Sequence, residues 1–257
     1  MKIDLNADVS EGFGAYASFE SEKLYDFITS ANIACGFHAG DPILMKNTLL
    51  KCQAKGIQMG AHPGYRDLVG FGRRALQLSD DEAVGDLLYQ VGALTLMGKS
   101  LSAHVNYVKL HGAWYNSAMQ GHNALAMIEA LAKAAPQLGW LALSSSPFAK
   151  VCEERSIPVF HEVFADRAYQ DNGALVSRNQ SGAVIHDSYR AIEHVKRMVI
   201  DGKVKTISGN LMPIQVDSIC IHGDNPSAVL FAEQLRGALE NEGVVFSAFN
   251  TLGASHV

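Results

Sequence analysis

The chain has 257 residues, 48% of them hydrophobic, and a formal net charge of -5. This length suits one large α/β domain or two small ones, and the hydrophobic fraction is too high for a disordered chain. No basic stripe follows any segment, which argues against nucleic acid as a partner.

The four cysteines (Cys35, Cys52, Cys152 and Cys220) are scattered without CxxC spacing. We therefore expect buried free thiols in a reducing compartment. The first residues include a carboxylate at Asp4 and no apolar stretch, and no segment reaches 18 apolar residues. These features predict a cytoplasmic protein without a signal peptide or a membrane span.

Short apolar runs alternate with longer helical patterns along the chain. Strands are predicted near 2–7, 28–34, 57–62, 105–111, 139–144, 157–163, 216–222 and 244–249. Helices are predicted near 42–55, 80–98, 115–135, 187–201 and 226–242, with start signals at Asp41-Pro42, Ser79-Asp80-Asp81-Glu82 and Asn225-Pro226. Such alternation is typical of parallel strands with crossover helices, and seven or eight units favour a closed (β/α) barrel. Without a Pro-, Gly- or Ser-rich linker or a repeat, residues 1–257 are predicted to form a single domain.

Two segments depart from this alternation. Residues 164–185 have little helical pattern and are predicted to form a long functional loop after a strand. Gly92–Ser100 resembles a phosphate-binding loop, but five residues separate its glycines where four are needed. Because it lies inside an apolar helical pattern, we interpret it as the end of a helix. The sequence thus shows no recognisable P-loop for ATP.

Polar residues recur with period two in five predicted strands. In the first strand, Asp4, Asn6 and Asp8 share one face, and Ile3, Leu5 and Ala7 share the other. The other four strands carry Gly60 and His62; Tyr107, Lys109 and His111; Glu162 and Asp166; and Cys220, His222 and Asp224. Since the apolar faces would pack under helices, the polar faces should point into the barrel. They cluster near strand ends, where barrel enzymes have their sites, which favours a site over hydrogen bonding at the rim.

Several roles are open for these groups. Lys109 is suited to bind a substrate carboxylate or phosphate, or to be held in an ion pair with Asp8 or Glu162, and the sequence does not separate the two. The plainest chemistry has His62 or His111 as general base and Asp8 or Glu162 as its acid/base partner.

A metal site is the alternative to this acid/base chemistry. Asp8, His62 and His111 are ligand types that zinc and other divalent ions accept, and Asp4, His38, Glu162 and His222 are further candidates. No local spacing such as HExxH supports a metal, so the leading prediction contains none. Arg73 and Arg167 lie on predicted loops, where a guanidinium can bind carboxylate or phosphate or be solvated.

Six stretches also carry a resemblance to a known family. They are Asp4–Asp8 with Glu11–Gly14, Ser30–Pro42, Gly60–Arg74, Val108–Asn116, Glu162–Tyr169 and Ile221–Asp224. In this order, over nearly the whole chain, they resemble the LamB/YcsF family. Ser10, Leu110, Trp114, Ser177 and Ser181 depart from residues usual in that family, but none of them removes a polar group of the predicted site.

The resemblance implies a distorted TIM-like (β/α) barrel, commonly seven-stranded and similar to glycoside hydrolase/deacetylase barrels. It implies ATP-dependent opening of 5-oxoproline to glutamate, with ATP as co-substrate and 5-oxoprolinase subunits B and C as partners. The predicted catalytic residues are Asp8, His62, Lys109, His111 and Glu162. The predicted substrate-binding residues are Asn6, Asn32, His38, Arg73, Asp166, Arg167, His222 and Asp224. Two alternative functions stay open: a stand-alone metal-dependent amidohydrolase or deacetylase, and a non-catalytic subunit that binds a small acid. The oligomeric state is open as well.

Overall fold

The computed structural model describes residues 1–14, 21–221 and 228–249. Within these ranges, seven parallel strands close into a barrel: β1 (Lys2–Val9), β2 (Ser30–Ala34), β3 (Gln58–His62), β4 (Val105–Val108), β5 (Gly139–Leu143), β6 (Val159–Phe164) and β9 (Ser218–Ile221). β1 pairs with both β2 and β9, which closes the ring. The short β10 (Val245–Phe246) runs beside the start of β1. The predicted seven-stranded (β/α) barrel is confirmed.

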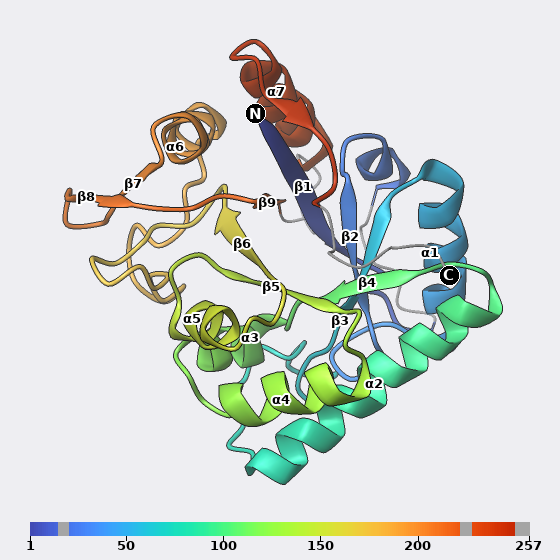
Figure 1. The fold of residues 1–257 in the computed structure, drawn as a ribbon. Coiled ribbons are helices and arrows are strands. Elements are labelled where there is room, and N and C mark those ends of the chain that lie inside the picture. Colours follow the sequence, from blue (N-terminus) through green and yellow to red (C-terminus); the bar gives the residue numbers. More distant parts are fainter. Residues whose placement is uncertain (15–20, 222–227, 250–257) are drawn as a thin grey trace.

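Helices surround this barrel, as Figure 1 shows. They are α1 (Pro42–Lys55), α2 (Asp80–Ser100), α3 (Gly112–Met119), α4 (Ala124–Ala134), α5 (Pro147–Glu154), α6 (Ser188–Ile200) and α7 (Ala228–Glu240), with a 3-10 turn at Glu22–Asp26. Two of the three predicted start signals work through backbone capping: the Asp41 carboxylate accepts from two amides of α1, and Ser79 and Glu82 form a capping box on α2. The third, Asn225-Pro226, lies outside the described residues.

Three local differences from the sequence prediction have physical causes. The single helix predicted over 115–135 is two helices, because Gly121 and Asn123 adopt positive φ between α3 and α4. The eight-residue α5 was not predicted, although Ser146 caps it and Pro147 occupies its first turn. A small antiparallel hairpin of β7 (Lys203–Lys205) and β8 (Leu211–Pro213) was also not predicted.

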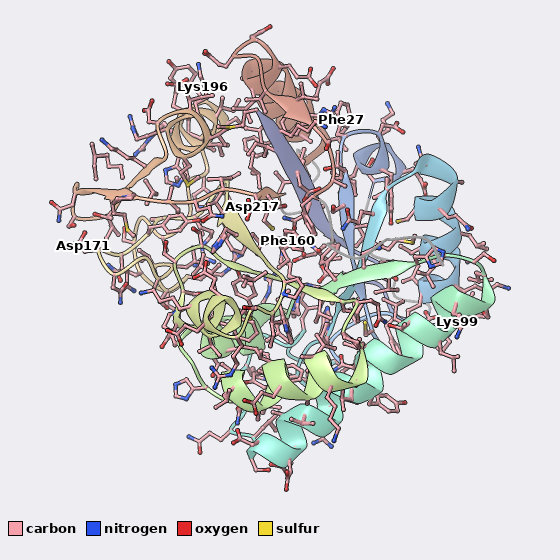
Figure 2. The ribbon with its side chains drawn as sticks, viewed as in Figure 1. Phe27, Lys99, Phe160, Asp171, Lys196 and Asp217 are labelled. Carbon is pink, nitrogen blue, oxygen red and sulfur yellow. The ribbon has the colours of Figure 1, made fainter. Side chains whose placement is uncertain are left out.

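The hydrophobic core lies between the barrel and its helices, where side chains fill the space between the ribbons (Figure 2). Ile3, Leu5 and Ala7 of β1 are buried in this layer, as the alternation predicted. All four cysteines are buried and free, which confirms the prediction of buried free thiols. The described helices include none that is both long and apolar enough to span a bilayer.

The two unusual segments take the forms predicted for them. Gly92–Ser100 lies within α2, whose exposed Lys99 is labelled in Figure 2. A phosphate-binding loop needs a strand-to-helix turn, so this segment is not one. Residues 165–187 contain no helix or named strand, and two isolated bridges hold them together.

Candidate active site

The interior of the barrel is polar, beginning at the amino-terminal ends of its strands. The Asp4 carboxylate accepts hydrogen bonds from the hydroxyl groups of Thr29 and Ser30, at 2.6 Å each, and from Ser218. Burial raises the pKa of Asp4 to about 6, although these three hydroxyls oppose the rise. The predicted inward face of β1 therefore starts with a buried carboxyl that has no ion pair among the described residues.

Lys109 lies immediately after β4, above this layer, and its side chain is 2% exposed. Its ammonium nitrogen is 2.7 Å from Glu162 Oε1 and 3.1 Å from Asp8 Oδ1. It also donates to Asn6 Oδ1 at 3.1 Å. Burial would lower the pKa of Lys109, but the charges of Asp8 and Glu162 hold it well above its usual value. The sequence left two roles open for Lys109, binding a ligand anion or forming an ion pair with Asp8 or Glu162. In the structure Lys109 forms ion pairs with both of these carboxylates.

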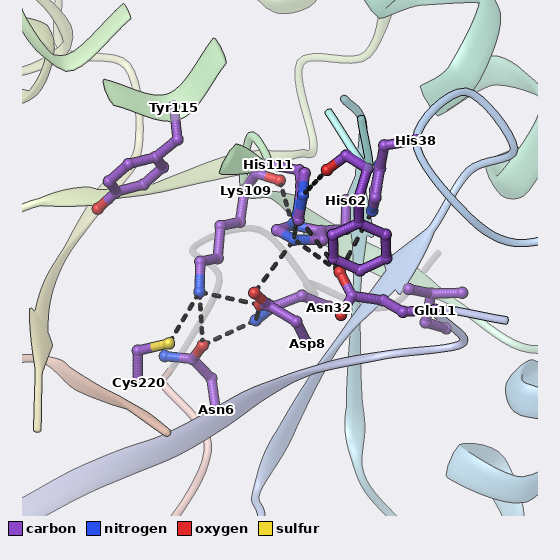
Figure 3. A network of polar contacts seen from close by, with 12 residues as sticks. Asn6, Asp8, Glu11, Asn32, His38, His62, Lys109, His111, Tyr115 and Cys220 are labelled. Carbon is purple, nitrogen blue, oxygen red and sulfur yellow. Dashed lines mark hydrogen bonds and ion pairs between the residues drawn. The ribbon is translucent and has the colours of Figure 1, made fainter. Parts of the chain in front are cut away.

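Asp8 joins Lys109 to a group of histidines (Figure 3). Its Oδ1 accepts from Asn32 Nδ2 at 2.8 Å, and its Oδ2 lies 3.3 Å from His62 Nε2. Burial would raise the pKa of this carboxyl, but His62 and Lys109 hold it well below its usual range. Asp8 is therefore an ionised carboxylate at neutral pH.

Four side chains at the ends of consecutive strands meet beside Asp8: Glu11 after β1, His38 after β2, His62 at the end of β3 and His111 after β4. The rings of His38 and His111 stack with their centroids 3.7 Å apart, and His62 stands perpendicular to both. Burial lowers the pKa of His38 and of His111 well below the usual histidine value. These two rings are therefore neutral near pH 7.

A cavity of about 740 Å³ opens at this carboxyl end of the barrel. Asp8, Glu11, His62 and His111 line one side, and residues 172–179 of the long loop line another. Tyr115 from α3 also faces the cavity and donates from its hydroxyl to Glu162 Oε2 at 2.9 Å. Part of the loop predicted over 164–185 thus lines the cavity, and its functional role stays a prediction.

Arg167 forms part of the cavity wall while being only 4% exposed. Its Nη2 donates to the backbone oxygen of Val176 at 2.5 Å, and burial lowers the pKa of its guanidinium. No carboxylate of the described residues forms an ion pair with it. The charge of the neighbouring Asp166 opposes this lowering of the pKa, but only in part. A buried guanidinium without a contact ion pair, on the wall of a cavity, is suited to bind an anionic group of a ligand.

The structure sorts the predicted site residues by position. Those on the cavity wall are Asp8, His62, Arg73, Lys109, His111 and Arg167. Asn6, Asn32, His38 and Glu162 are buried next to them and hold them through the contacts of the network. Asp166 does not line the cavity, because β6 ends at Phe164 and the chain turns before it. His222 and Asp224 lie outside the described residues.

Several residues of the site were not among the predicted ones. Tyr107, inside the barrel, donates from its hydroxyl to Asn32 Oδ1 at 2.6 Å. The Cys220 thiol lies 3.1 Å from the Lys109 ammonium nitrogen. Glu11 and Tyr115 were present in stretches that carry the family resemblance, and that was the only signal for them. A glutamate in a Gly-rich turn and a tyrosine in a helix have no local pattern that marks a site.

The sequence was compared with those of known families and proteins. The model of the LamB/YcsF family matches residues 3–254. A protein of Thermococcus onnurineus (strain NA1), named as the A subunit of 5-oxoprolinase, is 46% identical over 245 residues, which cover 95% of this chain and 96% of the relative. The protein of the same name from Mycolicibacterium gilvum (strain PYR-GCK) is 42% identical over 252 residues, which cover 96% and 99%.

Solved structures give the same picture of the fold. The crystal structure of the lactam utilization protein from Thermus thermophilus matches with a TM-score of 0.90 and 38% identity, covering 97% of this chain and 100% of that one. The catalytic domain of a peptidoglycan N-acetylglucosamine deacetylase from Eubacterium rectale ATCC 33656 matches with a TM-score of 0.53 and 10% identity, covering 97% and 89%. At that identity the second likeness shows a shared deacetylase-like barrel and nothing further.

Proposed function

The chain belongs to the LamB/YcsF family, and from this membership and its cavity we propose that it is the lactam-opening subunit of an ATP-dependent 5-oxoprolinase. Its relatives in Thermococcus and Mycolicibacterium are named as the A subunit of 5-oxoprolinase, and they align over nearly their full length. The Thermus protein with the same fold is described as a lactam utilization protein. The reaction would convert 5-oxo-L-proline to L-glutamate together with partner subunits.

The chemistry explains why ATP would be needed. The five-membered lactam is a resonance-stabilised amide whose amine stays tethered after opening, and intramolecular reclosure has a large entropic advantage. Phosphorylation of the amide oxygen would make the carbon a good electrophile for water. The protein must then bind the substrate carboxylate, accept a proton from water and supply one to the ring nitrogen.

Arg167 is the observation that carries the assignment. Lys109 is already in ion pairs with Asp8 and Glu162, so its charge is matched inside the barrel. The buried guanidinium of Arg167 forms part of the cavity wall, and no carboxylate of the described residues makes a contact ion pair with it. We therefore assign Arg167 to binding the substrate carboxylate. Lys109 instead holds Asp8 in position and balances its negative charge.

Proton transfer falls to the groups around Asp8. The pKa of Asp8 is held low, so this carboxylate is ionised and orients its neighbours. His62 Nε2 lies 3.3 Å from Asp8 Oδ2, and His111 Nδ1 lies 3.0 Å from His62 Nε2. Both rings line the cavity, where either nitrogen can take a proton from an attacking water.

Much of the ATP chemistry is assigned to the partner subunits, which would be named B and C. The one segment that resembles a phosphate-binding loop lies inside α2. Arg73 and Arg178 also line the cavity, where their guanidinium groups are suited to bind the phosphate of an activated group.

The experiment combines the purified chain with its candidate partner subunits, ATP and 5-oxoproline, and measures glutamate. We expect glutamate only from the complete mixture, and a large rise in KM for 5-oxoproline in the Arg167→Met variant. Arg155→Met is the control, because Arg155 pairs with Glu129 on the surface. No glutamate with partners of known activity would overturn the assignment. Hydrolysis of amides by the chain alone, without ATP, would instead support a stand-alone amidohydrolase. Unchanged turnover in Arg167→Met and His62→Gln would indicate a non-catalytic binding subunit.

A further inference from the structure

The group formed by Glu11, His38, His62 and His111 has more in common with a ligand set than with a hydrogen-bond network. One ligand-type atom from each side chain lies within 4.8 Å of all the others. Glu11 Oε1 is 3.3 Å from His38 Nε2, 3.3 Å from His111 Nδ1 and 4.0 Å from His62 Nε2. All three imidazoles are buried, and the Glu11 side chain is only 12% exposed.

Two of the rings have their tautomer fixed by the backbone. His62 Nδ1 lies 2.8 Å from the carbonyl oxygen of Lys109, and His111 Nε2 lies 2.9 Å from that of Phe71. A carbonyl oxygen only accepts, so both nitrogens carry hydrogen and donate. In the neutral rings, the nitrogens that remain are unprotonated, and these are the two that face each other at 3.0 Å.

We propose that Glu11, His38, His62 and His111 bind one divalent transition metal ion, of which zinc best suits three imidazoles and a carboxylate. Tetrahedral ligands held about 2.0–2.1 Å from zinc are separated from one another by about 3.3 Å. Four of the six separations here run from 3.0 to 4.0 Å and bracket that value, and all six lie within 4.8 Å. Metal-bound histidines commonly donate their second nitrogen to a backbone carbonyl, and His62 and His111 both do so.

A single proton shared within this group, in place of a metal ion, does not give every acceptor atom a hydrogen-bond donor. Protonated His62 would donate to His111 and pair with Asp8 Oδ2 at 3.3 Å. The unprotonated Nδ1 of His111 would still face the Glu11 carboxylate at 3.3 Å, where both atoms are acceptors. One divalent ion at the centre of the group matches all four electron-pair donors at once.

The backbone around the group is shaped to hold the rings in place. A Cβ added at Gly64 would collide with the His38 ring. At Gly72, which has a φ of +61°, a Cβ would come within 2.8 Å of His38 Cβ and 2.9 Å of His111 Cδ2. Glycine at these two positions lets the loop after β3 pack directly against the rings. Ligands fixed by strand ends and close backbone packing are pre-organised for a metal.

This site goes beyond the proposed reaction and does not depend on it, but it changes the choice of base. With the metal bound, His62 and His111 are ligands and no longer free to take a proton, so Asp8 replaces them as the proton acceptor on the cavity wall. Its Oδ1 is held by Lys109 and Asn32, while Oδ2 points to His62. When bound, the ion would supply Lewis-acid chemistry to the cavity.

The test uses the full chain alone, without ATP, 5-oxoproline or partner subunits. The protein is stripped with a chelator, its fold is checked by circular dichroism, and it is titrated with Zn²⁺ by calorimetry. Co²⁺ is added in parallel as a visible-absorption probe of coordination. We expect one ion per chain and a tetrahedral cobalt spectrum. Loss of a group that only hydrogen-bonds to a metal ligand typically lowers metal affinity about 10–100-fold. Removal of a ligand itself should lower the affinity more. We therefore expect roughly 100-fold or more in Glu11→Gln, His38→Gln and His111→Gln.

His161→Gln is the matched control, since His161 is also buried but pairs with Glu153 of α5 at 3.0 Å. It should bind the metal like the original chain. X-ray absorption of the zinc-loaded, unmodified protein covers the case in which a variant fails to fold, and should show about three imidazoles around the ion. A folded chain that takes up no stoichiometric metal, or variants of Glu11, His38 and His111 that bind as tightly as the control, would overturn the assignment. Neither result bears on glutamate formation by the complex.

Discussion

At the scale of single residues, ion pairs set the positions of charged side chains inside the barrel. The Lys109 ammonium lies between the carboxylates of Asp8 and Glu162 and is almost fully buried. Removing one partner from a buried ion pair leaves an uncompensated charge, which costs more than the pair itself contributes. The three side chains therefore act as one unit, and the position of Asp8 at the cavity depends on Lys109.

Lys109→Met tests this dependence. The methionine fills nearly the same volume but leaves Asp8 and Glu162 without a cation, so the free energy of unfolding should fall by roughly 3–5 kcal/mol. Adding Glu162→Gln to this variant should restore part of the loss, because it removes one of the two unmatched charges. Urea denaturation measures both. Lys99→Met, at the exposed end of α2, should change stability by no more than about 0.5 kcal/mol. A loss in Lys109→Met as small as this control would show that the carboxylates do not need the lysine.

Asp4 predicts a pH dependence of stability. Its folded-state pKa of about 6 lies above its ordinary value near 3.8, because it is buried. The neutral carboxyl therefore stabilises the fold below about pH 4, and this contribution is lost as the pH rises through 6. Asp4→Asn keeps a neutral group at all pH values. Its stability relative to the original chain should rise between pH 4 and 6 and then level off, by an amount on the order of 2–3 kcal/mol. Thermal unfolding at several pH values measures this difference, and a difference that does not change with pH would contradict the raised pKa.

At the scale of elements, the barrel depends on close contact between β3 and β4. The Tyr107 ring of β4 lies against Gly60 of β3, in the space that a Cβ at position 60 would occupy. From there its hydroxyl reaches Asn32 of β2, so one tyrosine links three neighbouring strands. At this point the polar interior is closely packed, with the glycine providing the space for the aromatic ring.

Gly60→Ala should lower stability by about 1–3 kcal/mol, because the added methyl group displaces the Tyr107 ring. Gly92→Ala is the control: Gly92 lies in the interior of α2 and a Cβ there meets nothing within 4 Å. Alanine has the higher helix propensity, so this variant should be more stable by up to about 1 kcal/mol. Chemical denaturation of both variants gives the comparison. An increase in stability for Gly60→Ala would contradict the packing described for Tyr107.

At the scale of the whole molecule, strands β1 to β4 and the loop after β6 bring the site residues together at the carboxyl end of the barrel. The cavity there combines the Lys109 ion pairs, the Glu11 and histidine group and the buried Arg167 from separate parts of the chain. The same closure leaves the segment that resembles a phosphate-binding loop on α2, outside the barrel. This separation is the physical basis for assigning much of the ATP chemistry to partner subunits.

The purified chain should therefore hydrolyse ATP in the presence of 5-oxoproline at only a small fraction of the rate of the complete mixture. Gly92→Ala should leave ATP-dependent glutamate formation by the complex unchanged, because its segment contacts no nucleotide in this assignment. Release of inorganic phosphate and of glutamate measure the two rates. A full catalytic rate of ATP hydrolysis by the chain alone would refute this division of labour.

The sequence by itself determined the class of fold, the family and most of the polar residues that meet in the barrel. Alternation along β1 placed Asp4, Asn6 and Asp8 on the inner face, since side-chain direction in a strand is a local property. The break between α3 and α4 and the short α5 were missed, because two residues with positive φ or an eight-residue helix give little periodic signal.

Only the tertiary structure decided which residues touch. Lys109 had two roles open until the fold placed Asp8 and Glu162 on either side of it. Glu11 was not predicted as a site residue, and the histidines lie at the ends of three different strands, so no spacing along the chain could show that the four converge. The barrel brings them together because its parallel strands all end at the same rim.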